Sequence, residues 1–295
     1  MPVLRKYSTL AVILNKLFVS MKPKLLSLIY LSAVPFLTAI LGFGIGHISY
    51  KLYLPIWIIN VCLMGTASWY LGLNTIKNKN NEKKHQALGS FFLIIPWILV
   101  SIFFGFGPPP EKMTDWVATA SEQQVRYSIL VGAGIFIAFG FSSLRQQLKD
   151  SGEFFYSNLG LGAIMIAIPL FIINMIFWGF YLTESFKIFT AAGSEQIPDW
   201  FPPLRKQFGL ISVVEVALTY LATASFTVSL RQIGWFNKTA TRIYIAISLF
   251  AFLVIVLSAF LSEPFVTAGI AVSIPAIPFI LPYFIGINLL RRLNK

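Results

Sequence analysis

Eight long runs of apolar residues, almost free of charged side chains, constrain the fold of this chain more than any other feature. They cover residues 25–46, 53–76, 88–107, 127–144, 159–182, 208–230, 243–261 and 265–290. A helix needs about 20 apolar residues to cross the hydrocarbon core of a bilayer. Seven of the runs contain no Asp, Glu, Lys or Arg, and the sixth contains one acid, Glu215. We therefore expect an all-α polytopic membrane helix bundle with eight transmembrane helices.

Composition supports the same class of protein. Hydrophobic residues make up 57% of the 295 residues and charged residues 12%, against about 25% charged residues in soluble domains. So few charges cannot cover this much apolar surface in water. A water-soluble enzyme, a nucleic-acid-binding domain and a disordered chain are therefore excluded.

The basic residues predict the orientation. The two terminal segments, together with the polar segments that follow the second, fourth and sixth runs, carry 17 of the 23 Lys and Arg residues. Basic residues accumulate on the cytoplasmic side of a membrane protein. We expect both termini in the cytoplasm and the protein in the plasma or inner membrane. The net charge of +12 then reflects topology and attraction to anionic lipid at the cytoplasmic face, with no role for nucleic acid.

Residues 1–24 precede the first run and have a helical repeat of apolar residues, among them Leu4, Tyr7, Leu14 and Phe18. This pattern predicts a cytoplasmic amphipathic helix that lies at the membrane interface. The alternative is a frayed tail. No hydrophilic insert divides the rest of the chain, so residues 25–295 are expected to form a single eight-helix transmembrane domain.

Glu215 is the strongest functional signal, because a carboxylate in hydrocarbon costs a few kcal/mol and normally faces a partner or an aqueous cavity. Ser212, Thr219 and Thr223 fall at i−3, i+4 and i+8 from it, which places all four residues on one helix face. This polar stripe is typical of a transport or proton site. The alternative is that Glu215 joins two helices by a hydrogen bond.

Prolines concentrate in the last run, at Pro275, Pro278 and Pro282. A proline inside a helix frees a backbone carbonyl one turn earlier, so the three together should bend or break the last helix. A broken helix can act as a gating element or coordinate a cation through its free carbonyls. Proline that only shapes helix packing is the alternative.

Polar residues at the extracytoplasmic ends of the runs predict an outer vestibule. His47 follows the first run, Glu263 follows the seventh, and Asp115 and Asp199 each precede a Trp in the two longer outer loops. In the functional interpretation these loops cover a vestibule that attracts cations. In the alternative their aromatic residues anchor them at the interface.

Three of the predicted helices end in a similar motif at the cytoplasmic side. Gly72, Gly140 and Gly286 are each followed by an apolar residue, Asn or Ser, any residue, Leu or Ile, and then a cation. One interpretation of this similarity is a decayed two-helix repeat, as many transporters contain. The alternative is that cations at cytoplasmic helix ends need no repeat to explain them.

Known catalytic and metal-binding patterns are missing. The sequence has one cysteine, Cys62, and two histidines, and it contains no HExxH, GxSxG, phosphate-binding lysine loop or DDxxD motif. We therefore expect no metal, no cofactor and no catalytic residues of a known type.

Three hypotheses about function remain. The first is a small-solute transporter or permease, coupled to protons or cations through Glu215. The second is a non-catalytic subunit or assembly factor of a membrane complex, with homo-oligomerisation or partner binding through small-residue helix faces. The third is an interfacial lipid-modifying enzyme, which predicts that His47, Glu263 and the loop acids converge.

Overall fold

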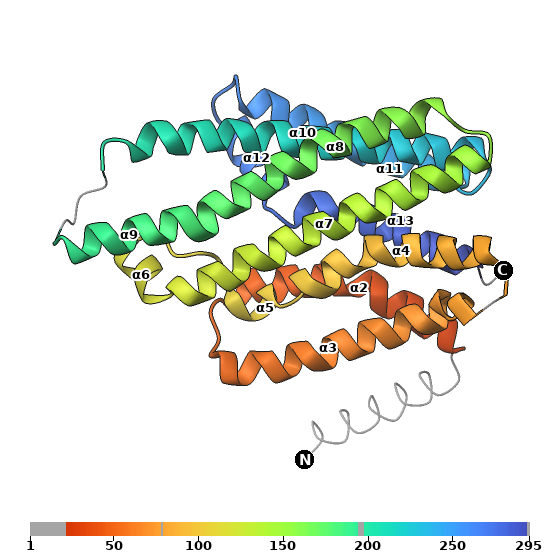
Figure 1. The fold of residues 1–295 in the computed structure, drawn as a ribbon, viewed down its shortest axis with the longest axis horizontal. Coiled ribbons are helices and arrows are strands. Elements are labelled where there is room, and N and C mark those ends of the chain that lie inside the picture. The colour runs from red at the N-terminus through yellow and green to blue at the C-terminus, as the bar shows by residue number, and fades with distance from the viewer. Residues whose placement is uncertain (1–21, 78, 194–197, 294–295) are drawn as a thin grey trace, which may run out of the picture.

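The structure is a computed structural model that describes residues 22–77, 79–193 and 198–293. Every regular element in these ranges is helical, and no strand occurs among them (Figure 1). This confirms the all-α fold class. The predicted amphipathic helix over residues 1–24 lies almost entirely outside the described residues, so it stays a prediction.

The long helices are α2 (Pro23–Gly44), α3 (Tyr50–Leu71), α4 (Asn81–Val100), α7 (Ala120–Asp150), α8 (Phe155–Ile176), α10 (Phe201–Gln232), α11 (Lys238–Ser258) and α13 (Ile280–Leu293). Shorter elements connect or extend them: η1 (Leu73–Lys77), α5 (Phe103–Phe106), α6 (Met113–Ala118), η2 (Phe177–Tyr181), α9 (Leu182–Ala191), α12 (Phe265–Ser273) and η3 (Ile277–Phe279).

Six helical spans in the described residues are long and apolar enough to cross a membrane, and the bent pair of α12 with η3–α13 makes a seventh. By length and composition the chain is a multi-pass membrane protein. The predicted count of eight is not confirmed, because α4 is not among the candidate spans. Asn80 caps α4 by accepting hydrogen bonds from the backbone N–H groups of Glu82 and Lys83. The helix therefore begins with charged residues, and its apolar part ends after Val100.

The helices run roughly along the long axis of the molecule, and successive connections alternate between its two ends (Figure 1). The connections after α3, α7 and α10, together with the end of α13, lie at one end, on the right of Figure 1. We call it the basic end, because most of its charged residues are Lys or Arg. The opposite end, with α6, the connection after α2, the end of α9 and the start of α10, is called the cavity end.

Helix α8 packs against α7 and α10, while α4 packs against α7 and α13. The helix that starts at α8 continues through the π-helical turn η2 into α9, giving 37 residues without a break. At 1.5 Å per residue it is about 55 Å long, well beyond the roughly 30 Å of a hydrocarbon core. Its far end, with the first turns of α10, therefore extends the cavity end (Figure 1).

Helices at the basic end approach one another closely at the three glycines of the shared motif. A Cβ atom on Gly286 would lie 2.6 Å from the carbonyl oxygen of Ser90 in α4. Cβ atoms on Gly140 and Gly72 would clash with Leu93 of α4 and with the backbone of Leu290 in α13. Close packing around α4 and α13 therefore explains the recurrence of glycine in this motif without an internal repeat.

The turn between α7 and α8 also belongs to the basic end and is fixed by Glu153. Its carboxylate accepts hydrogen bonds from the backbone N–H groups of Tyr156 (2.8 Å) and Ser157 (3.1 Å) in the first turn of α8. Burial opposes its ionisation, but hydrogen bonds from Ser229, Ser157 and these N–H groups outweigh burial and lower the pKa of Glu153. An ionised Glu153 thus joins α8 to α10 at this end.

Candidate functional site

A cavity of about 1290 Å³ lies at the cavity end, between α8–α9, α10, α12 and the segment that includes α6. We call it the large cavity. Its apolar wall includes Met175, Trp178, Phe208 and Ile270, and its polar wall includes Glu111, Lys112, Asn174, Arg205, Ser212, Glu215 and Ser273. Both signs of charge are therefore available to a polar solute inside it.

Glu215 lies in the wall of the large cavity and is 3% exposed. Its Oε1 atom accepts a hydrogen bond of 3.1 Å from Asn174 Nδ2 of α8. Its Oε2 atom is buried and has no hydrogen-bond partner among the described residues. Asn174 in turn accepts a hydrogen bond of 2.9 Å from Trp178 Nε1. The carboxyl group is thus held in place through one oxygen, while the other has no hydrogen-bond partner among the described residues.

The position of Trp178 follows from the π-helical turn η2, which begins one residue before it. Such turns add a residue to the helix and often occur at functional sites. Phe177 stacks on Phe208 of α10 with ring centroids 3.8 Å apart. A Cβ atom on Gly179 would overlap Tyr127 of α7. These contacts hold the η2 turn between α7 and α10 and orient Trp178 toward Asn174.

The polar stripe predicted on α10 divides into two parts. Ser212 and Glu215 line the large cavity. Thr219 and Thr223 are buried one and two turns further on, where each donates a 2.8 Å hydrogen bond to the carbonyl oxygen four residues earlier in α10. Their hydroxyl protons are used within the helix, so these two threonines do not extend the cavity wall.

The charged side chains of the large cavity are not those predicted for an outer vestibule. Among the predicted residues, Asp115, Asp199 and Glu263 are exposed and line no part of it. Glu263 accepts a hydrogen bond from the backbone N–H of Thr267. His47 is also exposed and pairs with Glu122 at 2.9 Å. Among the described residues, the acids and bases that line the cavity are Glu111, Lys112, Arg205 and Glu215.

Sequence reasoning missed Asn174, although a signal was present. Asn174 is an amide side chain in the middle of the fifth apolar run, four residues before a Trp. Polar side chains inside membrane helices commonly bond to another helix. Arg205 and Lys112 carried no such signal, because charged residues in loops and at helix ends are ordinary.

The last helix is broken as predicted: α12 and η3–α13 meet at 61°. The break follows Ser273, and Pro275 in the break lines the large cavity. Pro278 lies in η3 and Pro282 in the first turn of α13, and both are buried. Tyr220 of α10 donates a 3.0 Å hydrogen bond to the carbonyl oxygen of Val272. The helix that carries Glu215 is therefore bonded to the segment that ends at the break.

No group of three or more His, Cys, Asp or Glu side chains in the described residues is arranged to hold a metal ion. Comparison with protein-family models, curated proteins and solved structures gives no match.

Proposed function

We propose that this protein is a small-solute transporter or permease coupled to protons or cations, with Glu215 as the ionisable site. The observation that carries the proposal is the buried, unpartnered Oε2 atom of Glu215 in the wall of a cavity of about 1290 Å³. Inside a membrane span, an acid with a free oxygen is normally found where a proton or cation binds.

Three further contacts support this role. Asn174 fixes one carboxylate oxygen, so the carboxyl group does not have to reorder when a ligand binds. Ser212 lines the cavity one turn earlier on α10 and supplies a hydroxyl group. Pro275 and Ser273 close another part of the wall at the helix break, where a change in the angle between α12 and α13 would open or cover Glu215. In this proposal the basic end faces the cytoplasm and the large cavity opens on the other side.

The competing explanation is that the bond between Asn174 and Glu215 only holds α8 against α10, as expected in a subunit or assembly factor. The two explanations differ in whether water reaches the cavity wall. A single cysteine at position 212, in a Cys62→Ala background, tests this with a membrane-impermeant thiol reagent added from each side in turn. Val214→Cys is the matched control, because Val214 is 40% exposed on another face of α10.

We expect rapid labelling at position 212 from the cavity side and little labelling at position 214, where the thiol faces lipid. Labelling at neither position in the folded protein would contradict a water-filled pathway and favour the structural role. Labelling from the side of the basic end would contradict the proposed orientation.

Proteoliposomes that contain a pH-sensitive dye test the coupling itself. Gradients of Na⁺, K⁺ or guanidinium are imposed, and the internal pH is followed. We expect a cation-dependent pH change with the wild-type protein, a loss of at least about tenfold with Glu215→Gln, and no loss with Thr223→Val, whose hydroxyl group bonds within α10. A cation-dependent pH change that persists in Glu215→Gln would remove Glu215 from the mechanism.

A further inference from the structure

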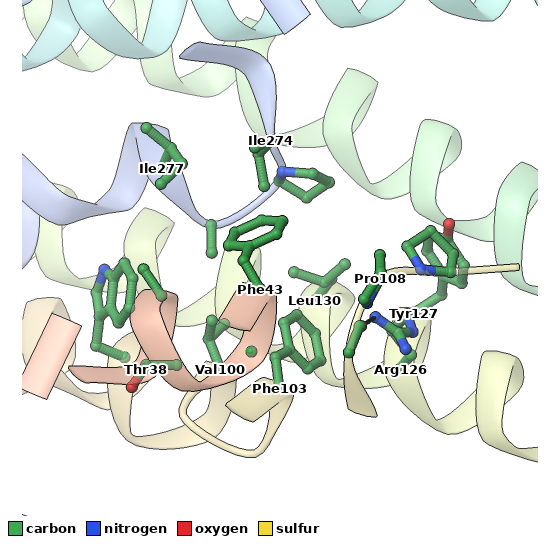
Figure 2. Close-up of a pocket in the computed structure, with 17 residues that line it drawn as sticks. Thr38, Phe43, Val100, Phe103, Pro108, Arg126, Tyr127, Leu130, Ile274 and Ile277 are labelled. Carbon is green, nitrogen blue, oxygen red and sulfur yellow. Dashed lines mark hydrogen bonds between the residues drawn. The ribbon is translucent and has the colours of Figure 1, made fainter. Parts of the chain in front are cut away.

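A second and smaller cavity, of about 260 Å³, lies beside the large one and has almost entirely apolar walls. We call it the apolar cavity. Figure 2 shows its lining: Thr38 and Phe43 of α2, Val100 and Phe103 near the end of α4 and in α5, Leu130 of α7, and Ile274 and Ile277 at the helix break. Phe43 is 62% exposed, so the cavity reaches the surface of the bundle beside α2. In a membrane that surface faces acyl chains.

One charged side chain lines the apolar cavity among the residues that the structure describes. Arg126 of α7 lies at one end of it, next to Pro108 and Tyr127 (Figure 2), and is 6% exposed. Its Nη1 and Nη2 atoms donate hydrogen bonds to the carbonyl oxygens of Gly107 (2.8 Å) and Phe106 (3.1 Å). Its Nε atom is buried and has no partner in the part of the chain that the structure describes.

The charge of Arg126 is poorly neutralised. The carboxylate of Glu122 is 4.0 Å from Nη2, too far for a hydrogen bond, and its other oxygen is bonded to His47 at 2.9 Å. The other close groups are neutral carbonyls and the rings of Phe103 and Phe106, whose centroids lie 5.5 and 5.2 Å from the guanidinium carbon. A buried guanidinium normally has a carboxylate or phosphate partner in direct contact. Among the described residues, the guanidinium group of Arg126 therefore has no anion in direct hydrogen-bond contact.

We propose that the apolar cavity binds an alkyl chain that ends in an oxyanion, with the chain against the apolar walls and the anionic head on the guanidinium group of Arg126. A free fatty acid and an anionic phospholipid both supply this chemistry. Pro109, Tyr127 and Pro275 line both cavities, so the head group would lie at the boundary with the large cavity. This site does not depend on Glu215 or on the proposed transport function.

Trp97 offers a direct readout, because it lines the apolar cavity. Bromine atoms on an acyl chain quench a Trp that they contact. Purified protein in detergent is titrated with 12-bromododecanoate and, in parallel, with its uncharged methyl ester. The same titrations with Trp97→Phe identify the part of the quenching that comes from this cavity.

We expect the carboxylate to quench Trp97 at a concentration at least about tenfold lower than the methyl ester. Arg126→Met should remove this difference, and Arg126→Lys should keep most of it because the cation remains. Arg205→Met is the matched control, since Arg205 lines the large cavity and not the apolar one. If Arg126→Met does not fold, the comparison of acid with ester in the wild-type protein still tests the charge.

Nanodiscs distinguish the two sources of the ligand. Brominated phosphatidylglycerol that quenches Trp97 more strongly than brominated phosphatidylcholine would identify a membrane lipid as the occupant. Quenching by the fatty acid without a difference between the two lipids would identify the free acid. Equal quenching by acid and ester, or quenching that is unchanged in Trp97→Phe, would overturn the proposal.

Discussion

The two ends of the bundle differ in how their buried polar groups are satisfied. At the basic end, Gly72, Gly140 and Gly286 leave no space for a methyl group, and the Glu153 carboxylate accepts hydrogen bonds from two backbone N–H groups of α8. A cavity of about 500 Å³ lies at the basic end between the start of α4 and the end of α7, whereas the large cavity and the apolar cavity both lie at the cavity end. Five buried polar side-chain atoms have no partner among the described residues. Three of them belong to side chains that line the large cavity or the apolar cavity: Trp97, Arg126 and Glu215.

This difference indicates that the two ends have different roles. Buried polar groups are almost always satisfied in proteins, and each exception calls for an explanation. The basic end shows that the chain can satisfy buried polar groups, since Glu153 is 4% exposed and each of its carboxylate oxygens accepts a hydrogen bond. The unsatisfied atoms at the cavity end are best explained by ligands or water that bind there, while the basic end holds the helices together.

The largest effect on stability is expected at Gly286, because α13 and α4 are in close backbone contact there. In Gly286→Ala the new methyl group would meet the carbonyl oxygen of Ser90 at 2.6 Å. Two backbones cannot separate without moving whole helices, so we expect a loss of about 3 kcal/mol in the free energy of unfolding. Denaturant unfolding in detergent measures this loss.

Gly209→Ala is the control for that variant. Gly209 lines the large cavity, and a Cβ atom there would have no neighbour within 4 Å. We expect a change of less than about 1 kcal/mol, with a stabilising sign because alanine favours the helix. Equal losses at positions 286 and 209 would contradict the contrast between a close helix contact at Gly286 and an open cavity wall at Gly209.

Glu153 should give the next largest effect. Glu153→Gln weakens the cap of α8, and loss of such a cap costs about 0.5–2 kcal/mol. Because hydrogen bonds lower the pKa of Glu153 in the folded protein, its ionised form stabilises the fold at neutral pH. This stabilisation is complete at pH values above the pKa that Glu153 has in the unfolded chain. It is lost as the pH falls through the lower pKa that Glu153 has in the folded protein.

Melting temperatures between pH 7 and pH 3 test this sign. The wild-type protein should lose more stability than Glu153→Gln on acidification, so the two curves should converge at low pH. Curves that remain parallel over this range would show that the Glu153 carboxylate does not stabilise the basic end.

A smaller effect is expected at Tyr220, which connects α10 to the helix break. Tyr220→Phe removes the hydrogen bond to the carbonyl oxygen of Val272, worth about 1 kcal/mol. We expect the labelling rate of a cysteine at position 274 to rise about fivefold, because the break opens more often. Tyr244→Phe is the control, since Tyr244 bonds to Asn288 of α13 instead. A rise in both variants would point to general loosening of the bundle.

The smallest effect concerns His47 and Glu122, which form an exposed pair at the cavity end. A double-mutant cycle with His47→Ala and Glu122→Gln should give a coupling of at most about 0.5 kcal/mol, as is usual for exposed ion pairs. The corresponding cycle for His47 with Glu263 should give no coupling. Strong coupling in the second cycle would restore the hypothesis that these two residues act together at an outer opening.

The helical spans were largely predictable, but their ends were not. The fourth apolar run, residues 127–144, corresponds to a helix that covers Ala120–Asp150. Glu122 lies in its first turn and Lys149 in its last, where each charge interacts favourably with the helix dipole. Polar residues that extend a helix beyond the hydrocarbon carry no hydropathy signal. The same limitation applies to α4, whose charged first turn is helical.

The sequence by itself determined that this chain is a helical multi-pass membrane protein with a break in its last helix. Transfer into hydrocarbon is a sum over neighbouring residues, and proline acts on its own helix, so both properties are local. The tertiary structure decided which polar groups meet. Asn174 and Glu215 are 41 positions apart, and Arg126 binds carbonyl groups 19 and 20 positions earlier. Such pairs depend on how each helix is rotated and where helices cross, and side-chain packing between helices sets both.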